Sequence, residues 1–252
     1  MVATLYIDGA WKSASDGGAH DVHSPHDQSD VATVSQATQD DVLDAITAAR
    51  TSFDSGIFTS WSFAERSALV ARIADILERD LKVIAKKESD DTGKRIVEAE
   101  YDIADVIATF RHFAALGSKQ HDRVVDVGIS HVSSRIVHEP LGVCSLIGPW
   151  NYPLLQIAWK VAPALVAGCS FIVKPSELTP QSAIALMHAI EEAGTPQGVA
   201  NLVLGPGSVV NVSLLCVSNF TNSCAATNIN VTNFTRWHTK LGSCTFFSNK
   251  LN

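Results

Sequence analysis

Residues 143–174 read VCSLIGPWNYPLLQIAWKVAPALVAGCSFIVK and contain two apolar runs separated by a helical stretch. The runs Val143–Ile147 and Ser170–Val173 are nearly continuous in apolar side chains, which is typical of strands buried on both faces of a sheet. The stretch between them, Leu154–Val166, precedes Gly168, a residue type that favours the end of a helix. Two strands joined by a crossover of this length are expected to lie parallel.

The same alternation continues toward the carboxyl end. A second helical stretch, Pro180–Ala193, ends before Gly194 and leads to a third apolar run at Ala200–Leu204. Residues 142–210 are therefore predicted to form a βαβαβ unit, and the fold class is α/β with a Rossmann-like parallel sheet.

Residues 1–120 are predicted to supply strands and helices that flank this unit. The segment Leu5–Trp11 indicates a hairpin that turns at Asp8-Gly9. Apolar side chains at helical spacing predict a first helix from about Thr38.

Two more helices follow. The second is predicted to begin at Ser62, with Glu65 three residues later as a capping box, and to continue through Ile84. The third is expected to run from about Ile96 and to stop at Gly117, because glycine tolerates the left-handed end conformation.

Residues 121–141 are predicted to form a pair of half-exposed strands, Val124–Val127 and Val132–Val137, since β-branched and polar residues alternate there.

The last 42 residues, 211–252, have a different composition. All 26 acidic residues lie at or before Glu192, while the tail contains eight of the ten asparagines. Neither a helical nor a strand period is sustained, so an irregular segment unrelated to the rest is expected. Four Asn-x-Ser/Thr sequons occur there, at Asn211, Asn219, Asn230 and Asn233. They are attributed to chance in an Asn-rich segment, and a secreted glycoprotein stays a remote alternative.

Composition limits the function classes. The net charge of −7 argues against a nucleic-acid partner, since phosphate backbones attract basic surfaces. No secretory signal and no apolar run long enough to cross a membrane is found, so a soluble, cytoplasmic protein without a membrane partner is expected. Five cysteines without a Cys-x-x-Cys pair favour a reducing compartment.

The loops Gly148–Pro153 and Lys174–Glu177 each follow a predicted strand. Ligands of open α/β sheets bind outside the carboxyl ends of the strands, so both loops are expected to face one crevice. No Gly-x-Gly-x-x-Gly follows the first strand, and a packed α/β layer without a ligand is an equal alternative at this point.

Several short segments, taken in order, resemble a known family. They are Glu139-Pro140-Leu141-Gly142-Val143, Pro149-Trp150-Asn151-Tyr152-Pro153-Leu154, Pro163-Ala164-Leu165, Lys174-Pro175-Ser176-Glu177 and Thr179-Pro180. The chain resembles the NAD(P)-dependent aldehyde dehydrogenase superfamily over about residues 5–210. The Trp-Asn-Tyr-Pro-Leu-Leu segment and His112-Phe113-Ala114-Ala115 are similar to its betaine-aldehyde and aminoaldehyde branch. The resemblance implies the fold of that family, with an incomplete cofactor sheet.

The resemblance also implies roles for individual residues. Asn151 would donate to the negative oxygen that forms on the aldehyde carbon, although an amide that satisfies its own loop is the alternative. Lys174 and Glu177 would bind the adenosine ribose of NAD, and Glu177 would disfavour the 2′-phosphate of NADP. The other predicted cofactor residues are Ile147, Pro149, Trp150, Gly205 and Pro206.

Family chemistry further needs a cysteine thiolate and a glutamate base, and neither is placed in this chain. The resemblance therefore implies a truncated, catalytically incomplete member of a family that oxidises aldehydes to carboxylic acids with NAD, and the sequence does not decide whether this chain is an enzyme. One alternative is a non-catalytic fragment that binds adenosine or NAD. Another is a fragment that associates with other subunits, either in a homo-oligomer or with a full-length relative. The last is a mis-spliced product without function. Lost strands would leave Ala200–Leu204, or a neighbouring strand, as an exposed apolar edge.

Other candidate residues are assigned no chemistry. His20, His23 and His26 are evenly spaced, but Pro25 interrupts them, and no metal site is predicted. Cys144 and Cys169 are interpreted as small apolar side chains of the core.

Overall fold

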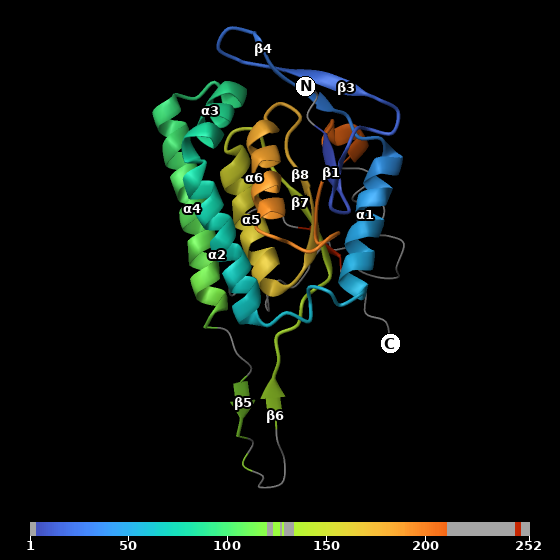
Figure 1. Cartoon of the computed structure of the whole chain (residues 1–252), viewed down its shortest axis with the longest axis vertical. Helices are drawn as coiled ribbons and strands as arrows, with labels where there is room; N and C mark the ends of the chain where they lie inside the picture. Colours follow the sequence, from blue (N-terminus) through green and yellow to red (C-terminus); the bar gives the residue numbers. More distant parts are fainter. Residues whose placement is uncertain (1–3, 120–122, 127, 129–133, 211–244, 248–252) are drawn as a thin grey trace.

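The computed structural model describes residues 4–119, 123–126, 128, 134–210 and 245–247 as an α/β fold around a six-stranded sheet (Figure 1). In chain order the elements are β1 (Leu5–Ile7), β2 (Ala10–Lys12), β3 (Ala19–His23), β4 (Asp30–Ser35), α1 (Gln39–Asp54), α2 (Phe63–Arg79), α3 (Leu81–Thr92), α4 (Ile96–Gly117), β5 (Arg123–Val125), β6 (Ser134–Ile136), β7 (Val143–Ile147), α5 (Pro153–Ala167), β8 (Ser170–Lys174), α6 (Gln181–Glu192), β9 (Ala200–Leu202) and β10 (Thr245–Phe247).

The central sheet has the strand order β10-β7-β8-β9-β1-β2. The strands β7, β8 and β9 are parallel, and Ile147 at the end of β7 is in register with Lys174 at the end of β8. The remaining pairs are antiparallel. The predicted βαβαβ unit is confirmed, and so is the hairpin that β1 and β2 form around Asp8-Gly9.

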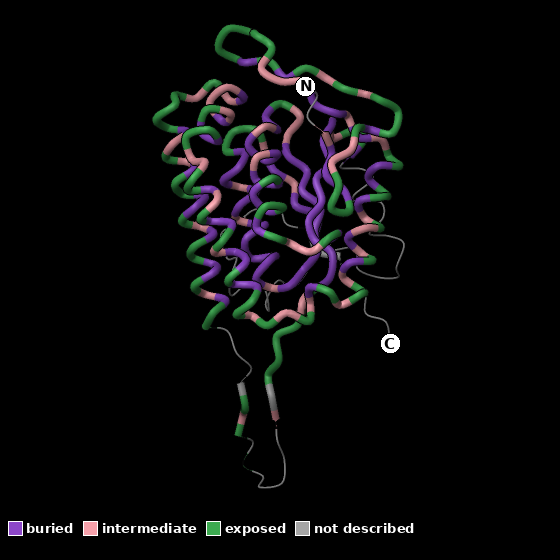
Figure 2. The backbone as a smooth tube through the Cα atoms, viewed as in Figure 1, coloured by how far each residue is buried: buried purple, intermediate pink, exposed green. Residues whose placement is uncertain are grey.

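Helices cover both faces of the sheet (Figure 1). The helices α5 and α6 pack on one face, α1 packs on the other, and α2 and α4 form an outer layer against α5. Figure 2 shows the buried residues concentrated in the sheet and in the helix faces that contact it. The hairpin β3–β4 lies at one end of the sheet, and the ribbon β5–β6 projects from the opposite end.

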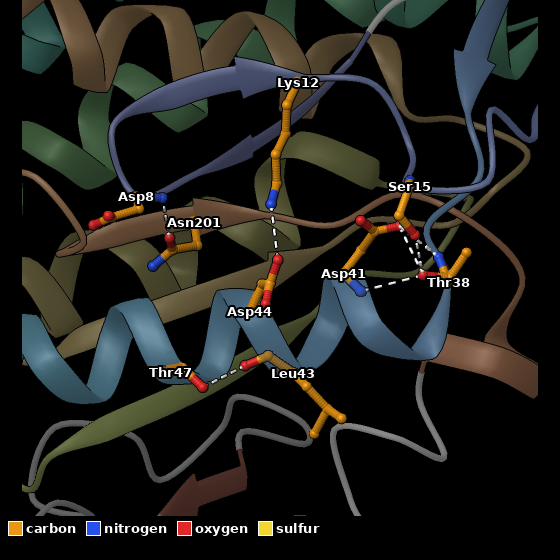
Figure 3. Close-up of polar contacts among 9 residues, drawn as sticks. All are labelled: Asp8, Lys12, Ser15, Thr38, Asp41, Leu43, Asp44, Thr47 and Asn201. Carbon is orange, nitrogen blue, oxygen red and sulfur yellow. Dashed lines mark hydrogen bonds and ion pairs between the residues drawn. The ribbon is translucent and has the colours of Figure 1, made fainter.

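The helices α1 and α2 begin where predicted, and each has a capping box, of which only the one at Ser62 was predicted. The Thr38 hydroxyl accepts a hydrogen bond from the Asp41 backbone N–H, and the Asp41 carboxylate accepts one from the Thr38 backbone N–H. The Ser15 backbone N–H also donates to Asp41, at 3.1 Å, which ties the chain after β2 to the start of α1 (Figure 3). Ser62 and Glu65 form the same reciprocal pair at the start of α2.

Of the two forms of the edge prediction, the one in which Ala200–Leu204 is exposed is wrong. The strand β9 pairs with β8 on one side and with β1 on the other, and its residues are buried. The fully buried Asn201 completes this junction, because its Oδ1 accepts from the Asp8 backbone N–H at 3.0 Å (Figure 3). Its amide nitrogen donates to the carbonyl oxygens of Gly198 and Phe171. The amino-terminal hairpin therefore covers the edge that the local sequence left open.

The predicted helix from Ser62 through Ile84 is two helices. Asp80 has φ −99° and ψ 8°, which ends α2, and its carbonyl oxygen then accepts from the Ile84 N–H of α3. The Asp80 carboxylate binds Arg79, which also binds Glu192, the last residue of α6. Aspartate is unfavourable inside a helix, because its side chain competes with the backbone for hydrogen bonds. Asp80 therefore favours the break between α2 and α3.

Gly117 occupies its position for a different reason from the one predicted. It is the last helical residue of α4, and no left-handed conformation occurs there. A Cβ atom on Gly117 would lie 2.4 Å from Val166 Cγ1 and 2.5 Å from Ser67 Oγ. Glycine is thus needed because α4 approaches α2 and α5 closely at this point.

Replacing Gly117 with Ala is expected to lower the free energy of unfolding by about 1–3 kcal/mol, because the added methyl group overpacks this contact. Urea denaturation followed by circular dichroism measures the change. In the double variant Gly117→Ala/Val166→Ala the contact with Val166 Cγ1 is removed, although the one with Ser67 Oγ remains. The two substitutions together should therefore lower the free energy of unfolding by less than the sum of their separate effects. Simple additivity would contradict this packing role.

The half-exposed strands predicted in residues 121–141 are β5 and β6, while Val127, Val132 and Ser133 lie outside the described residues. Three tail residues, Thr245–Phe247, form β10 and pair antiparallel with β7. The four sequons and the cysteines of the tail lie outside the described residues. Among the described helices, none is both long and apolar enough to cross a membrane.

Candidate functional site

The predicted site residues follow three neighbouring parallel strands. Because β7, β8 and β9 are adjacent and parallel, their carboxyl ends lie at one edge of the sheet. The Gly148 N–H donates to the Lys174 carbonyl oxygen at 2.9 Å, which joins the start of the first loop to the end of β8. The set brought to this edge is Ile147, Pro149, Trp150, Asn151, Lys174, Glu177, Gly205 and Pro206. Their roles in binding stay predictions.

Lys174 and Glu177 form an ion pair at the end of β8. Lys174 Nζ lies 3.2 Å from Glu177 Oε2, with the lysine side chain 3% exposed and the glutamate side chain 39% exposed. Burial acts to raise the pKa of Glu177, but hydrogen bonding to its own backbone N–H and the charge of Lys174 outweigh it and lower the pKa below its usual value. The site therefore presents an ionised carboxylate to solvent beside a sheltered ammonium.

His20 is a contact of this pair that the sequence did not reveal. It lies on β3, and its Nε2 donates to the Glu177 carbonyl oxygen at 3.1 Å across 157 residues of sequence. The hairpin β3–β4 thereby holds the backbone of the Lys174–Glu177 loop. Even spacing had singled out His20 only as one of three histidines, and no local pattern points to Glu177.

The loop after β7 presents Asn151 to solvent. Asn151 is exposed, and among the described residues its side-chain amide has no hydrogen-bond partner. The loop then enters α5 directly, with Pro153 as the first helical residue. Gly148 permits this turn, because a Cβ atom there would lie 2.6 Å from Ile157 Cγ1. The alternative in which the amide satisfies its own loop is not what the structure shows.

Asp91 anchors the helix that follows the Lys174–Glu177 loop. Its two carboxylate oxygens accept from the backbone N–H and from the side-chain Nε2 of Gln181, the first residue of α6, at 2.8 and 2.7 Å. Burial raises the pKa of Asp91 to about 7, in spite of these two hydrogen bonds. Glu88, also buried, contributes to the shift through its negative charge.

The raised pKa predicts a pH dependence of stability. The unfolded chain releases the Asp91 proton near pH 4, whereas the folded protein keeps it up to about pH 7, so the free energy of unfolding falls as the pH rises across this interval. Between pH 6 and pH 8 the free energy of unfolding of wild type should fall by about 1.4 kcal/mol more than that of Asp91→Asn. Urea denaturation at both pH values measures the difference. Asp44→Asn is the control, since Asp44 pairs with Lys12 on the surface and is not among the charges that shift the Asp91 pKa.

No group of three or more His, Cys, Asp or Glu side chains is arranged to hold a metal ion in the part of the chain that the structure describes. His20 and His23 have separate contacts, since His20 Nε2 binds the Glu177 carbonyl oxygen and His23 Nδ1 pairs with Asp30. Cys144 and Cys169 are unoxidised and fully buried. The prediction that both are core residues is confirmed.

Comparison with known proteins then decides the family. The model of the aldehyde dehydrogenase family matches residues 11–221. The chain belongs to this family. A betaine aldehyde dehydrogenase of Bacillus subtilis (strain 168) is 45% identical over 214 residues, and an aminoacetaldehyde dehydrogenase of Pseudomonas aeruginosa is 39% identical over 203 residues.

Solved members of the aldehyde dehydrogenase family have the same fold. A betaine aldehyde dehydrogenase from Staphylococcus aureus, solved in complex with NAD+, superposes with a TM-score of 0.82 at 40% identity. The match covers 84% of this chain and 42% of that structure. The sequence matches likewise cover 85% of this chain and 44% of the Bacillus subtilis protein, so the chain spans less than half the length of these relatives.

Proposed function

We propose that this chain binds the adenosine end of NAD at the carboxyl edge of its sheet, within an aldehyde dehydrogenase that oxidises an aldehyde to a carboxylic acid. The observation that carries the proposal is the Lys174–Glu177 pair, which lies beside the Asn151 loop. Ribose hydroxyls donate and accept hydrogen bonds, and a carboxylate next to an ammonium offers the complementary groups. The NAD+ complex of the Staphylococcus aureus relative supports this proposal.

Each of these side chains then has a defined task. Glu177 accepts from the ribose hydroxyls, Lys174 donates to them, and His20 keeps the Glu177 backbone in place. NAD, when bound, supplies a hydride acceptor. Asn151 donates to the oxygen of the aldehyde as negative charge develops there, an interaction that is typically worth about 3 kcal/mol.

The proposed substrate is an aldehyde of the betaine-aldehyde or aminoaldehyde class. Similarity to the betaine aldehyde dehydrogenase of Bacillus subtilis and to the aminoacetaldehyde dehydrogenase of Pseudomonas aeruginosa supports it. We expect no turnover by this chain alone. A thiolate that attacks the aldehyde must reach it, and the two cysteines among the described residues, Cys144 and Cys169, are 0% exposed.

Isothermal titration calorimetry of the purified chain with NAD, AMP and NADP tests the proposal. AMP and NAD are both expected to bind, since each carries the ribose that Lys174 and Glu177 contact. NADP should bind at least tenfold more weakly, because the Glu177 carboxylate repels a 2′-phosphate. Absence of heat with both AMP and NAD, from a chain whose circular dichroism shows that it is folded, would rule the proposal out.

A second proposed function is subunit association through the ribbon β5–β6. This ribbon projects from the body of the protein (Figure 1), and Val124 and Ile136 on it are 69% and 39% exposed, while Val137, the residue after β6, is 53% exposed. Exposed apolar strands pair readily with another chain. Sedimentation equilibrium of wild type and of Val124→Asp/Val137→Asp tests this: wild type should associate and the variant should not.

A further inference from the structure

The Lys94 side chain contacts two acidic residues, the buried Glu88 and the partly buried Asp102, and also the Asn151 loop. Lys94 follows Gly93, which ends α3 in the left-handed conformation with φ 71°. Its side chain is only 13% exposed, although lysine normally extends into water. Some interaction must therefore compensate for the partial loss of hydration.

Two carboxylates hold the ammonium from the helix side. Lys94 Nζ lies 2.5 Å from Asp102 Oδ2 on α4 and 3.6 Å from Glu88 Oε1 on α3. The Glu88 side chain is 0% exposed, and burial raises its pKa. A sheltered ammonium with charged partners on two helices has little freedom to move, unlike a surface lysine.

On its opposite side the same ammonium contacts the loop after β7. Lys94 Nζ donates to the Asn151 carbonyl oxygen at 3.3 Å and lies 4.8 Å from the centre of the Tyr152 ring. A cation at this distance from an aromatic ring is attracted to it. The loop side chains themselves are open to solvent, with Trp150 60% and Tyr152 47% exposed. Tyr152 precedes α5 without a side-chain cap, so these two contacts hold the middle of the loop.

We propose that Lys94 is a positioning residue for Asn151, in that its ammonium, anchored by Asp102 and Glu88, fixes the backbone of the loop that carries the Asn151 amide. The meaning of this position for catalysis rests on the proposed function, in which that amide meets the developing negative oxygen. A preorganised donor needs a rigid backbone, because an amide that must first be ordered loses part of its stabilising effect. Lys94 supplies this rigidity from outside the loop.

Selective ¹⁵N labelling of tyrosine tests the proposal on the intact chain. The protein has three tyrosines, so the backbone signal of Tyr152 is read beside those of Tyr6 on β1 and Tyr101 on α4. In wild type the Tyr152 order parameter should be that of rigid backbone, about 0.85. In Lys94→Met it should fall below about 0.6 while Tyr6 and Tyr101 keep their wild-type values.

Three further variants separate positioning from general support. Lys94→Arg keeps a cation that can reach Asp102 and the Asn151 carbonyl oxygen, and it should restore the Tyr152 order parameter. Lys86→Met, which removes a surface ion pair of α3, should leave all three tyrosine signals unchanged. Lys94→Met leaves the buried Glu88 without its cation, which can destabilise the fold. The double variant Glu88→Gln/Lys94→Met removes Lys94 without leaving that unpaired carboxylate, and it serves as a second test.

The outcomes decide between the two roles. A loss of order confined to Tyr152 in both Met backgrounds, with rescue by Arg, supports positioning. An unchanged Tyr152 signal, or an equal loss at Tyr6, Tyr101 and Tyr152 in both backgrounds, overturns it. AMP affinity, measured on the same samples, tests the proposed function separately: failure of wild type to bind AMP would remove that function and leave the result for Lys94 standing.

Discussion

Replacing Arg66 with Met is expected to lower the free energy of unfolding by about 3–4 kcal/mol, the largest loss from any single substitution considered. Arg66 is 3% exposed, and its Nε donates to the Val166 carbonyl oxygen at 2.9 Å. Its Nη1 donates to the Trp61 carbonyl oxygen. Methionine fills the space but leaves the buried Val166 carbonyl group and the partly buried Trp61 carbonyl group without their Arg66 donors. It also removes a positive charge from the carboxyl end of α5, where the helix dipole favours one.

Urea denaturation followed by circular dichroism gives the value, and Arg72→Met is the matched control. Arg72 also caps the carboxyl end of a helix, since its guanidinium donates to the Ala193 carbonyl oxygen at 3.2 Å, but it is exposed to solvent. Water can replace its hydrogen bonds, so Arg72→Met should lower the free energy of unfolding by about 1 kcal/mol or less. If Arg66→Met lowers the free energy of unfolding no more than Arg72→Met does, the Val166 and Trp61 carbonyl groups find other partners.

Replacing Lys174 with Met is expected to weaken AMP binding about 10- to 100-fold, which corresponds to one or two hydrogen bonds from a charged donor. Lys174 is 2% exposed at the end of β8, and methionine preserves its buried stem while removing the ammonium. The Glu177 carboxylate also loses the cation 3.2 Å away that holds it in place. Because Glu177 remains partly solvated, the fold should tolerate the change.

Calorimetry with AMP measures the loss, and unfolding curves establish that the variant is folded. Lys12→Met is the control, since it breaks a similar pair, with Nζ 3.1 Å from Asp44 Oδ2, on the surface. The control should bind AMP as wild type does. A folded Lys174→Met chain with unchanged AMP affinity would remove Lys174 from the binding site.

Features set within a few residues were predicted correctly. The start of α2 follows from the capping box of Ser62 and Glu65, which lie within one helical turn, and the start of α1 near Thr38 follows from apolar side chains at helical spacing. The strand–helix alternation of residues 142–204 follows from continuous apolar runs and from Gly168, which takes the left-handed conformation at φ 84°. Such signals need no knowledge of the rest of the chain.

Features set by distant neighbours were missed or predicted for the wrong reason. Gly117 is recognisable as special in the sequence, but its cause is the approach of Val166 on another helix. The pairing of β9 with β1 depends on Asn201 and Asp8, which are 193 residues apart. The contact of His20 with Glu177 has the same origin, since no local period encodes it.

The sequence by itself determined the family, the parallel unit and the two loops that carry Asn151 and Glu177, because these depend on local apolar patterns and on short motifs. Only the tertiary structure decided that an amino-terminal hairpin covers β9 and that Lys94 reaches the Asn151 loop across 57 residues. The physical reason is the sequence separation between the residues that make these contacts. Hydrogen bonds and ion pairs between distant segments form only after the helices have packed on the sheet, so the residues that make them carry no signal until the fold brings them together.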